Sequence, residues 1–160
     1  MTRLPLFHST VRPEWIDYNG HMSEAFYVLV FGHATDALMI GTGLDSGYRE
    51  TTGCSLYTAE SHVRFLREVP AASHLAVRTR VLGAAAARKA RFTHEMYVVS
   101  GPESEPPSGA VPVATTELLA VHVDQRAGRA VEFPDAVRRR FTELTEPAPE
   151  WAGRSIPAVA

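Results

Sequence analysis

The stretch from residue 23 to residue 41 carries apolar side chains at a helical repeat and almost no charge. Its main apolar positions are Phe26, Val30, Ala34 and Leu38, with Tyr27, Phe31 and Met39 beside them. Gly41 and Gly43 follow, and glycine is the usual residue just past a helix end. A helix this apolar has to be covered over most of its surface, so the rest of the chain must be built around it.

One β-strand candidate precedes this helix and four follow it. They span residues 6 to 12, 54 to 67, 74 to 83, 88 to 99 and 113 to 124. Turns and loops join the later strands, which predicts an antiparallel sheet with the helix on one face. Residues 134 to 144 predict a short amphipathic helix that starts at a proline. We therefore expect one α+β domain over residues 1–145, with a five-stranded sheet, and an extended tail over residues 146–160.

Length, charge and cysteine content limit the classes of function. A chain of 160 residues fits a single domain, and a net charge of -2 gives no basic excess for nucleic acid. Cys54 is the single cysteine, so it can form no disulfide within the chain and it lacks the spacing of a zinc site. No stretch has the pattern of a signal peptide or a membrane span, so we expect a cytoplasmic protein that binds neither membrane nor nucleic acid.

The most reactive side chains stand directly before the apolar helix, in the segment DYNGHMSEAFY at residues 17 to 27. Asp17 supplies a carboxylate, and a helix start supplies backbone N–H groups that have no partner inside the helix. Gly20 has no side chain to obstruct a substrate. The N–H groups of Gly20, His21 and Met22 are the predicted donors to a developing oxyanion. The alternative is that the same residues only form a turn and cap the helix.

This segment resembles the Asp-x-x-Gly-His-x-x-x-x-x-Tyr signature of the 4-hydroxybenzoyl-CoA thioesterase-like branch of the hot-dog superfamily. In that fold a bent antiparallel sheet wraps one long central helix, and the order of elements matches over about residues 6 to 125. The segments VRPEWIDYNGHM, FGHATDAL and LYTAESHVRFLREV are most similar to the betainyl-CoA thioesterases of carnitine breakdown, including forms fused to a carnitine dehydrogenase.

The resemblance implies that the protein hydrolyses an acyl-CoA to the free acid and CoA. It also implies that Asp17 attacks the thioester or activates the water that does. The resemblance implies no metal and no other cofactor; coenzyme A enters the reaction as part of the substrate. The resemblance further implies a homodimer, or a tetramer built from two dimers, with active sites between subunits.

Aromatic residues around the signature are candidates for binding the acyl group. A betaine group carries a quaternary ammonium, which binds to the faces of aromatic rings. Trp15 and Tyr18 flank Asp17, so they are the predicted walls of such a site, and Tyr27 is a further candidate. Asn19 and His21 are candidates for positioning water or substrate.

Polar residues farther along the chain give further candidates. Thr58, Glu60 and His62 alternate onto one face of a predicted strand, where Glu60 and His62 could enter the site of a partner subunit. Glu24 and Asp36 on the helix are, with Glu60, the rival carboxylates to Asp17. The phosphates of CoA could meet a group of basic residues, namely Arg88, Lys89, Arg91 and the arginines at 138 to 140.

Two other functions stay open from the sequence. A hot-dog dehydratase or hydratase would pair His21 with Glu60 across a dimer. A non-catalytic acyl-CoA-binding protein would keep the fold without turnover.

Overall fold

The computed structural model describes residues 3–83 and 86–159. Its elements are, in chain order, β1 (Phe7–Thr10), a 3₁₀ turn (Pro13–Trp15), α1 (Glu24–Thr42), α2 (Ser46–Thr52), β2 (Cys54–Phe65), β3 (His74–Leu82), β4 (Lys89–Val99), β5 (Ala114–Asp124), β6 (Arg129–Ala130), α3 (Asp135–Glu143) and β7 (Thr145–Glu146). Each predicted strand and helix is present, with ends that shift by one or two residues.

The short elements α2, β6 and β7 are absent from the prediction. β6 and β7 have two residues each, too few for any periodic pattern. α2 has seven residues and is defined by its ends instead. Asp45 Oδ1 accepts a hydrogen bond from the Tyr48 N–H at 2.9 Å, and Gly53 closes the helix with a φ of 71°.

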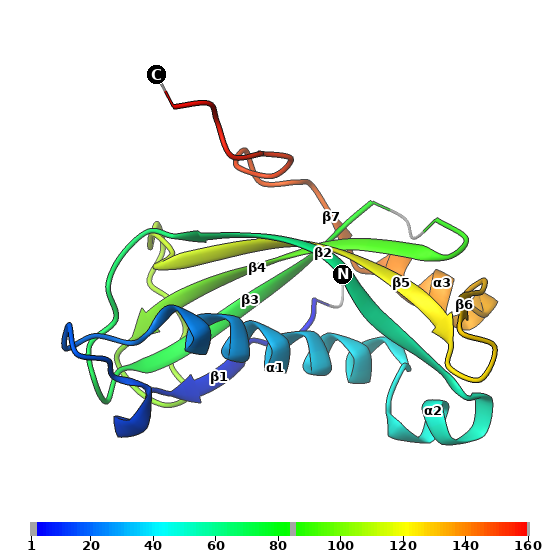
Figure 1. Cartoon of the computed structure of the whole chain (residues 1–160), viewed down its shortest axis with the longest axis horizontal. Helices are drawn as coiled ribbons and strands as arrows, with labels where there is room; N and C mark the ends of the chain where they lie inside the picture. The colour runs from blue at the N-terminus through cyan, green and yellow to red at the C-terminus, as the bar shows by residue number, and fades with distance from the viewer. Residues whose placement is uncertain (1–2, 84–85, 160) are drawn as a thin grey trace.

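The sheet is antiparallel in its five main strands, in the order β1-β3-β4-β5-β2. β6 extends β5, and β7 pairs in parallel with β3. The sheet curls, and α1 lies along its concave side, as Figure 1 shows. The predicted architecture of a bent sheet around one long helix, with a short C-terminal helix, is confirmed.

α1 is anchored to the sheet along its whole length. Val30, Ala34 and Leu38 are each no more than 1% exposed. The N-terminal half of the helix packs on Leu75, Val77 and Met96, among others, and the C-terminal half packs on a cluster that includes Phe92, Phe133 and Phe141. By length and composition alone α1 could span a membrane, but its packing as the central helix accounts for its apolar character.

β2 lies at the edge of the sheet and contains a β-bulge. Its pairing with β5 shifts between Thr58 and Glu60, so that Ala59 has no partner. A bulge reverses the alternation of side chains along a strand. Leu56 and Thr58 before it therefore line the same cavity as Ser61 and Val63 after it.

The bulge corrects one prediction. Thr58 does not share a face with Glu60 and His62, because it points to the cavity beside α1. Glu60 and His62 instead line a cavity with Glu117, which alternates along β5 with the α1-facing Thr116 and Leu118.

After β7 the chain continues without helix or strand over residues 147–159. The N–H of Gly153 donates to the Glu117 carboxylate, which holds this segment over β5.

Candidate active site

A tight turn immediately before α1 presents Asp17. Ile16 and Met22 form an isolated antiparallel bridge, and the Asp17 N–H donates to the His21 carbonyl at 3.0 Å. Inside this turn the Asn19 N–H donates to Asp17 Oδ1 at 2.8 Å. Since only Oδ1 of Asp17 accepts a hydrogen bond from the described residues, Oδ2 is left for a substrate or a water.

Gly20 is required by the backbone of this turn. Its φ is +82°, in the left-handed region, and a Cβ built there would meet nothing within 4 Å. The space in front of Gly20 is therefore open, and the positive φ by itself accounts for a glycine in this turn.

Tyr27 and Glu68 complete the surroundings of the turn. Tyr27 is 4% exposed, and its hydroxyl donates to the Arg67 carbonyl at 3.1 Å. Burial raises the pKa of Tyr27, and the nearby carboxylates of Glu68 and Asp17 raise it further, while a backbone hydrogen bond at Val69 opposes them. Tyr27 is thus a buried, neutral support beneath Asp17.

Glu68 is a site residue that sequence reasoning missed. Its Oε2 lies 3.3 Å from His21 Nε2 in a partly exposed pair. Glu68 follows β2, far from the signature in sequence, and only the fold brings it to the turn. Its one sequence signal was its place in the segment LYTAESHVRFLREV, which carried part of the family resemblance.

The predicted oxyanion donors need a correction. The Gly20 N–H donates to the Asp17 carbonyl at 3.0 Å, and the Met22 N–H donates to the Val69 carbonyl at 2.9 Å. Both are therefore occupied. Within residues 3–83 and 86–159, the N–H groups of His21, Glu24 and Ala25 donate to no acceptor.

The start of α1 keeps these donors available because its cap is incomplete. Ser23 is the N-cap residue, and its side chain makes no capping hydrogen bond. The Glu24 and Ala25 N–H groups thus stay unpaired at the positive end of the helix dipole, whereas the Phe26 N–H donates to the Ser23 carbonyl at 3.0 Å. This arrangement places a carboxylate beside hydrogen-bond donors for a polarised carbonyl oxygen.

The structure does not bring Trp15 and Tyr18 to one surface. Trp15 is 5% exposed and stacks on Phe26 with ring centroids 5.4 Å apart, and the Arg12 guanidinium lies 5.7 Å from the Trp15 ring. Tyr18 is 98% exposed, and Asn19 is also at the surface. Trp15 supports the turn from below, whereas Tyr18 is open to any ligand.

Glu60 and His62 lie apart from the Asp17 turn within one chain. They line a cavity of about 300 Å³ with Arg91, Glu117 and Arg154, which contains no residue of the turn. Three of the six basic candidates for CoA phosphates form ion pairs within the chain. Arg91 binds Glu117, and on α3 Arg138 binds Asp135 and Arg140 binds Glu143.

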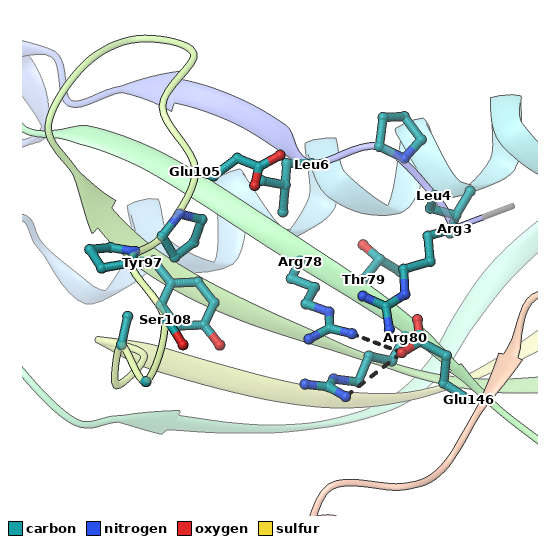
Figure 2. A pocket seen from close by; sticks show the side chains of 15 residues that line it. Arg3, Leu4, Leu6, Arg78, Thr79, Arg80, Tyr97, Glu105, Ser108 and Glu146 are labelled. Atoms are coloured by element: carbon teal, nitrogen blue, oxygen red, sulfur yellow. Dashed lines mark hydrogen bonds and ion pairs between the residues drawn. The ribbon is translucent and has the colours of Figure 1, made fainter. Parts of the chain in front are cut away.

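A cavity of about 540 Å³ lies on the sheet face away from α1, beneath the N-terminal segment and the loop after β4, as Figure 2 shows. Arg78 and Arg80 point into it and both pair with Glu146, at 2.8 and 3.7 Å. Arg80 also meets Glu95 at 3.1 Å. Burial, with the adjacent Glu95, raises the pKa of Tyr97 in this cavity to about 12. Arg78 and Arg80 are thus paired with glutamates in one ion-pair network along this cavity.

Beneath α1, His94 links the helix to the sheet. Its two ring nitrogens lie 2.9 Å from the hydroxyls of Thr35 and Thr79, and its ring stacks on Phe31. Burial lowers the pKa of His94 to about 3, so the imidazole is neutral. In the described part of the chain, no group of three or more His, Cys, Asp or Glu side chains could hold a metal ion.

Known proteins resemble this chain in sequence. The family model of the Thioesterase-like superfamily matches residues 11–141. The chain is 39% identical over 158 residues to a betainyl-CoA thioesterase of Pseudomonas aeruginosa, an overlap of 96% of this chain and 94% of that protein. It is 42% identical over 160 residues to the L-carnitine dehydrogenase/betainyl-CoA thioesterase of Agrobacterium fabrum, an overlap of 98% of this chain and 31% of that longer protein.

Solved structures resemble the chain over nearly its whole length. A protein of Pseudomonas putida KT2440, described as a candidate thioesterase, is 30% identical with a TM-score of 0.78, and the match covers 100% of this chain and 99% of that one. A Staphylococcus aureus protein solved with CoA has the same fold, at 20% identity and a TM-score of 0.82 over 99% of both chains. The chain therefore belongs to the Thioesterase-like superfamily and is a thioester hydrolase.

Proposed function

We propose that the protein hydrolyses an acyl-CoA thioester, with betainyl-CoA as its preferred substrate and Asp17 as the reacting carboxylate. The observation that carries this proposal is the position of Asp17 beside the uncapped start of α1. The relatives that are named betainyl-CoA thioesterases support the choice of acyl group. The Staphylococcus aureus protein that was solved with CoA shares the fold and supports the choice of thiol.

The reaction needs hydrogen-bond donors at the oxygen of the thioester carbonyl and a carboxylate near its carbon. The N–H groups of Glu24 and Ala25, with that of His21, would bind the carbonyl oxygen as it gains negative charge. Asp17 Oδ2 would either attack the carbonyl carbon or take a proton from the water that attacks. The carbon–sulfur bond then breaks, the sulfur leaves as the CoA thiol and takes up a proton, and the acid is released. Attack by Asp17 itself adds one step, in which water cleaves an anhydride.

The neighbours of Asp17 position it in this proposal. The Asn19 N–H fixes Oδ1, so that Oδ2 faces the substrate side. Glu68 holds the His21 ring at the mouth of the site. The dehydratase alternative would pair His21 with Glu60 of a second copy; within one chain His21 pairs with Glu68.

A second copy of the chain is part of the proposal. β2 is a twelve-residue edge strand with one unpaired side. Tyr57, Phe65 and Leu66 are exposed along or just after it, at 46, 47 and 39%. Long unpaired edges with exposed apolar residues are usually covered in the native state. We infer a homodimer through this region, which two dimers could extend to a tetramer.

The test measures thiol release from a panel of acyl-CoAs that includes betainyl-CoA. We expect Asp17→Asn to lower kcat by about 100- to 10,000-fold, the usual contribution of a catalytic acid or base. Asp45→Asn is the matched control, since Asn can still cap α2 and Asp45 lies outside the site. Thiol release that is unchanged in Asp17→Asn would transfer the role to Glu24, Glu60 or Glu68. Thermal stabilisation by acyl-CoA without any thiol release would identify a binding protein instead.

A further inference from the structure

The cavity beside α1 opens between the helix and the strands β2 and β5, on the concave side of the sheet. Its volume is about 330 Å³, within the range of small-molecule sites. Six apolar side chains form most of its walls, and four hydroxyl side chains lie among them. The apolar ones are Val28, Phe31, Met39, Leu56, Val63 and Leu118, and the hydroxyls are those of Thr35, Thr58, Ser61 and Thr116. Of the described residues that line it, Asp36 alone carries a charge.

A buried hydroxyl in this cavity lacks a partner. Thr116 is 1% exposed, and its Oγ1 makes no hydrogen bond with the described residues. The Oγ1 atoms of Thr93 and Thr115 are unpaired in the same way, but of these three hydroxyls Thr116 alone lines the cavity, where a water or another hydrogen-bonding group could reach it. Thr116 is on β5, next to the edge strand β2, and lines the cavity.

The lining selects one class of ligand. An anion would be repelled by Asp36, and a strongly hydrated cation would lose its water against the apolar walls. A quaternary ammonium fits both features, because its charge is positive and its surface is made of methyl groups. We propose that this cavity binds the trimethylammonium end of the acyl group, with Asp36 as its counter-ion. This inference rests on the proposed function, since it identifies the acyl pocket of that same site.

The geometry then requires residues from two copies. Asp36 lies twelve residues after the first residue of α1, which is about 18 Å along the helix. In a betainyl thioester a single methylene separates the carbonyl carbon from the ammonium nitrogen. Asp17 and Asp36 of one chain therefore cannot hold the two ends of the same acyl group. Asp17 must come from a second copy packed on this face of α1, where Val28 and Ile40 are 50 and 67% exposed.

The test compares two acyl groups of equal shape. 3,3-Dimethylbutyryl-CoA replaces the ammonium nitrogen of betainyl-CoA with carbon and so removes only the charge. We expect Asp36→Asn to lower kcat/KM for betainyl-CoA at least about tenfold while changing that for the neutral isostere little. Asp36→Glu keeps the charge and should retain most of the preference. Asp45→Asn, the same chemical change outside the cavity, should leave both values unchanged.

A steric variant tests the location independently of charge. A Cβ at Gly32 would meet nothing within 4 Å, so Gly32→Leu can project into the cavity without a backbone clash. We expect it to lower kcat/KM for both substrates. Suppose that wild type hydrolyses both acyl-CoAs and that neither Asp36→Asn nor Gly32→Leu changes kcat/KM for either one. This inference is then wrong, while the proposed thioesterase function is unaffected. If wild type releases no thiol from any acyl-CoA, the proposed function fails with it.

Discussion

His94 sits in the core as a neutral imidazole between two threonine hydroxyls. Burial lowers its pKa to about 3 in the folded protein, whereas an unfolded chain gives histidine a pKa of about 6.5. The unfolded state therefore binds the proton first as the pH falls. The stability that His94 confers is complete above about pH 6.5 and declines as the pH falls toward 3.

This titration predicts a loss of about 2 kcal/mol in the free energy of unfolding between pH 7 and pH 5, at 1.36 kcal/mol per pKa unit. Urea titrations of wild type and His94→Gln at both pH values would measure it. The variant should be less stable at pH 7 but lose about 2 kcal/mol less on acidification. Equal losses in the two proteins would show that His94 is not responsible.

At this scale the sequence predicted the candidate site only where its residues are neighbours along the chain. Asp17, Gly20 and Tyr27 belong to one segment, and the structure places them around one turn. The acceptor of the Met22 N–H is Val69, and the partner of His21 is Glu68. Such partners come from distant segments, and no local pattern shows which N–H group a carbonyl will occupy.

Among the helices, α2 depends on the residue that caps its start. Asp45 Oδ1 caps the Tyr48 N–H, and the helix has only seven residues to hold it together. We expect Asp45→Ala to lower the free energy of unfolding by about 1 kcal/mol, and Asp45→Asn to restore most of it. Thermal and urea unfolding of the three proteins would check this. Because α2 lies outside the proposed site, kcat/KM should stay within twofold or so of wild type; a larger fall would place α2 in the site.

Elements with a strong period were predictable, and irregular ones were not. The apolar repeat of α1 and the alternating β-strands define the sheet and its central helix. The bulge at Ala59 has no compositional signal, since alanine is ordinary in either position. A prediction from simple alternation therefore assigns Thr58 to the wrong face of the strand. It also misses that Thr58 lines the cavity beside α1.

For the whole molecule, the fold follows from one constraint. A helix as apolar as α1 needs a sheet to cover its apolar side, and the chain has enough strands for that; the opposite side, with Val28, Leu29 and Ile40, stays exposed, so the expected cover over most of the helix is not complete within one chain. What a single sequence does not display is the contact between two copies. The unpaired side of β2 and the exposed part of α1 become visible only when the strand order is known.

Mixed dimers test the shared site. Asp17→Asn and Asp36→Asn subunits should each be poor hydrolases of betainyl-CoA alone. If each site combines Asp17 of one copy with Asp36 of the other, a mixed dimer has one intact site. Statistical exchange of subunits should then restore roughly a quarter of wild-type activity. Absence of any recovery, after size-exclusion and mass measurements confirm mixed dimers, would show that no site combines Asp17 of one copy with Asp36 of the other.

The bulge at Ala59 also bears on how chains of this kind can diverge. Side chains that face the cavity occupy even positions before it and odd positions after it. A single-codon insertion or deletion nearby would exchange a whole set of lining side chains for those on the opposite face. A new acyl group could thus become acceptable in one mutational event, where ordinary substitutions would need several in succession.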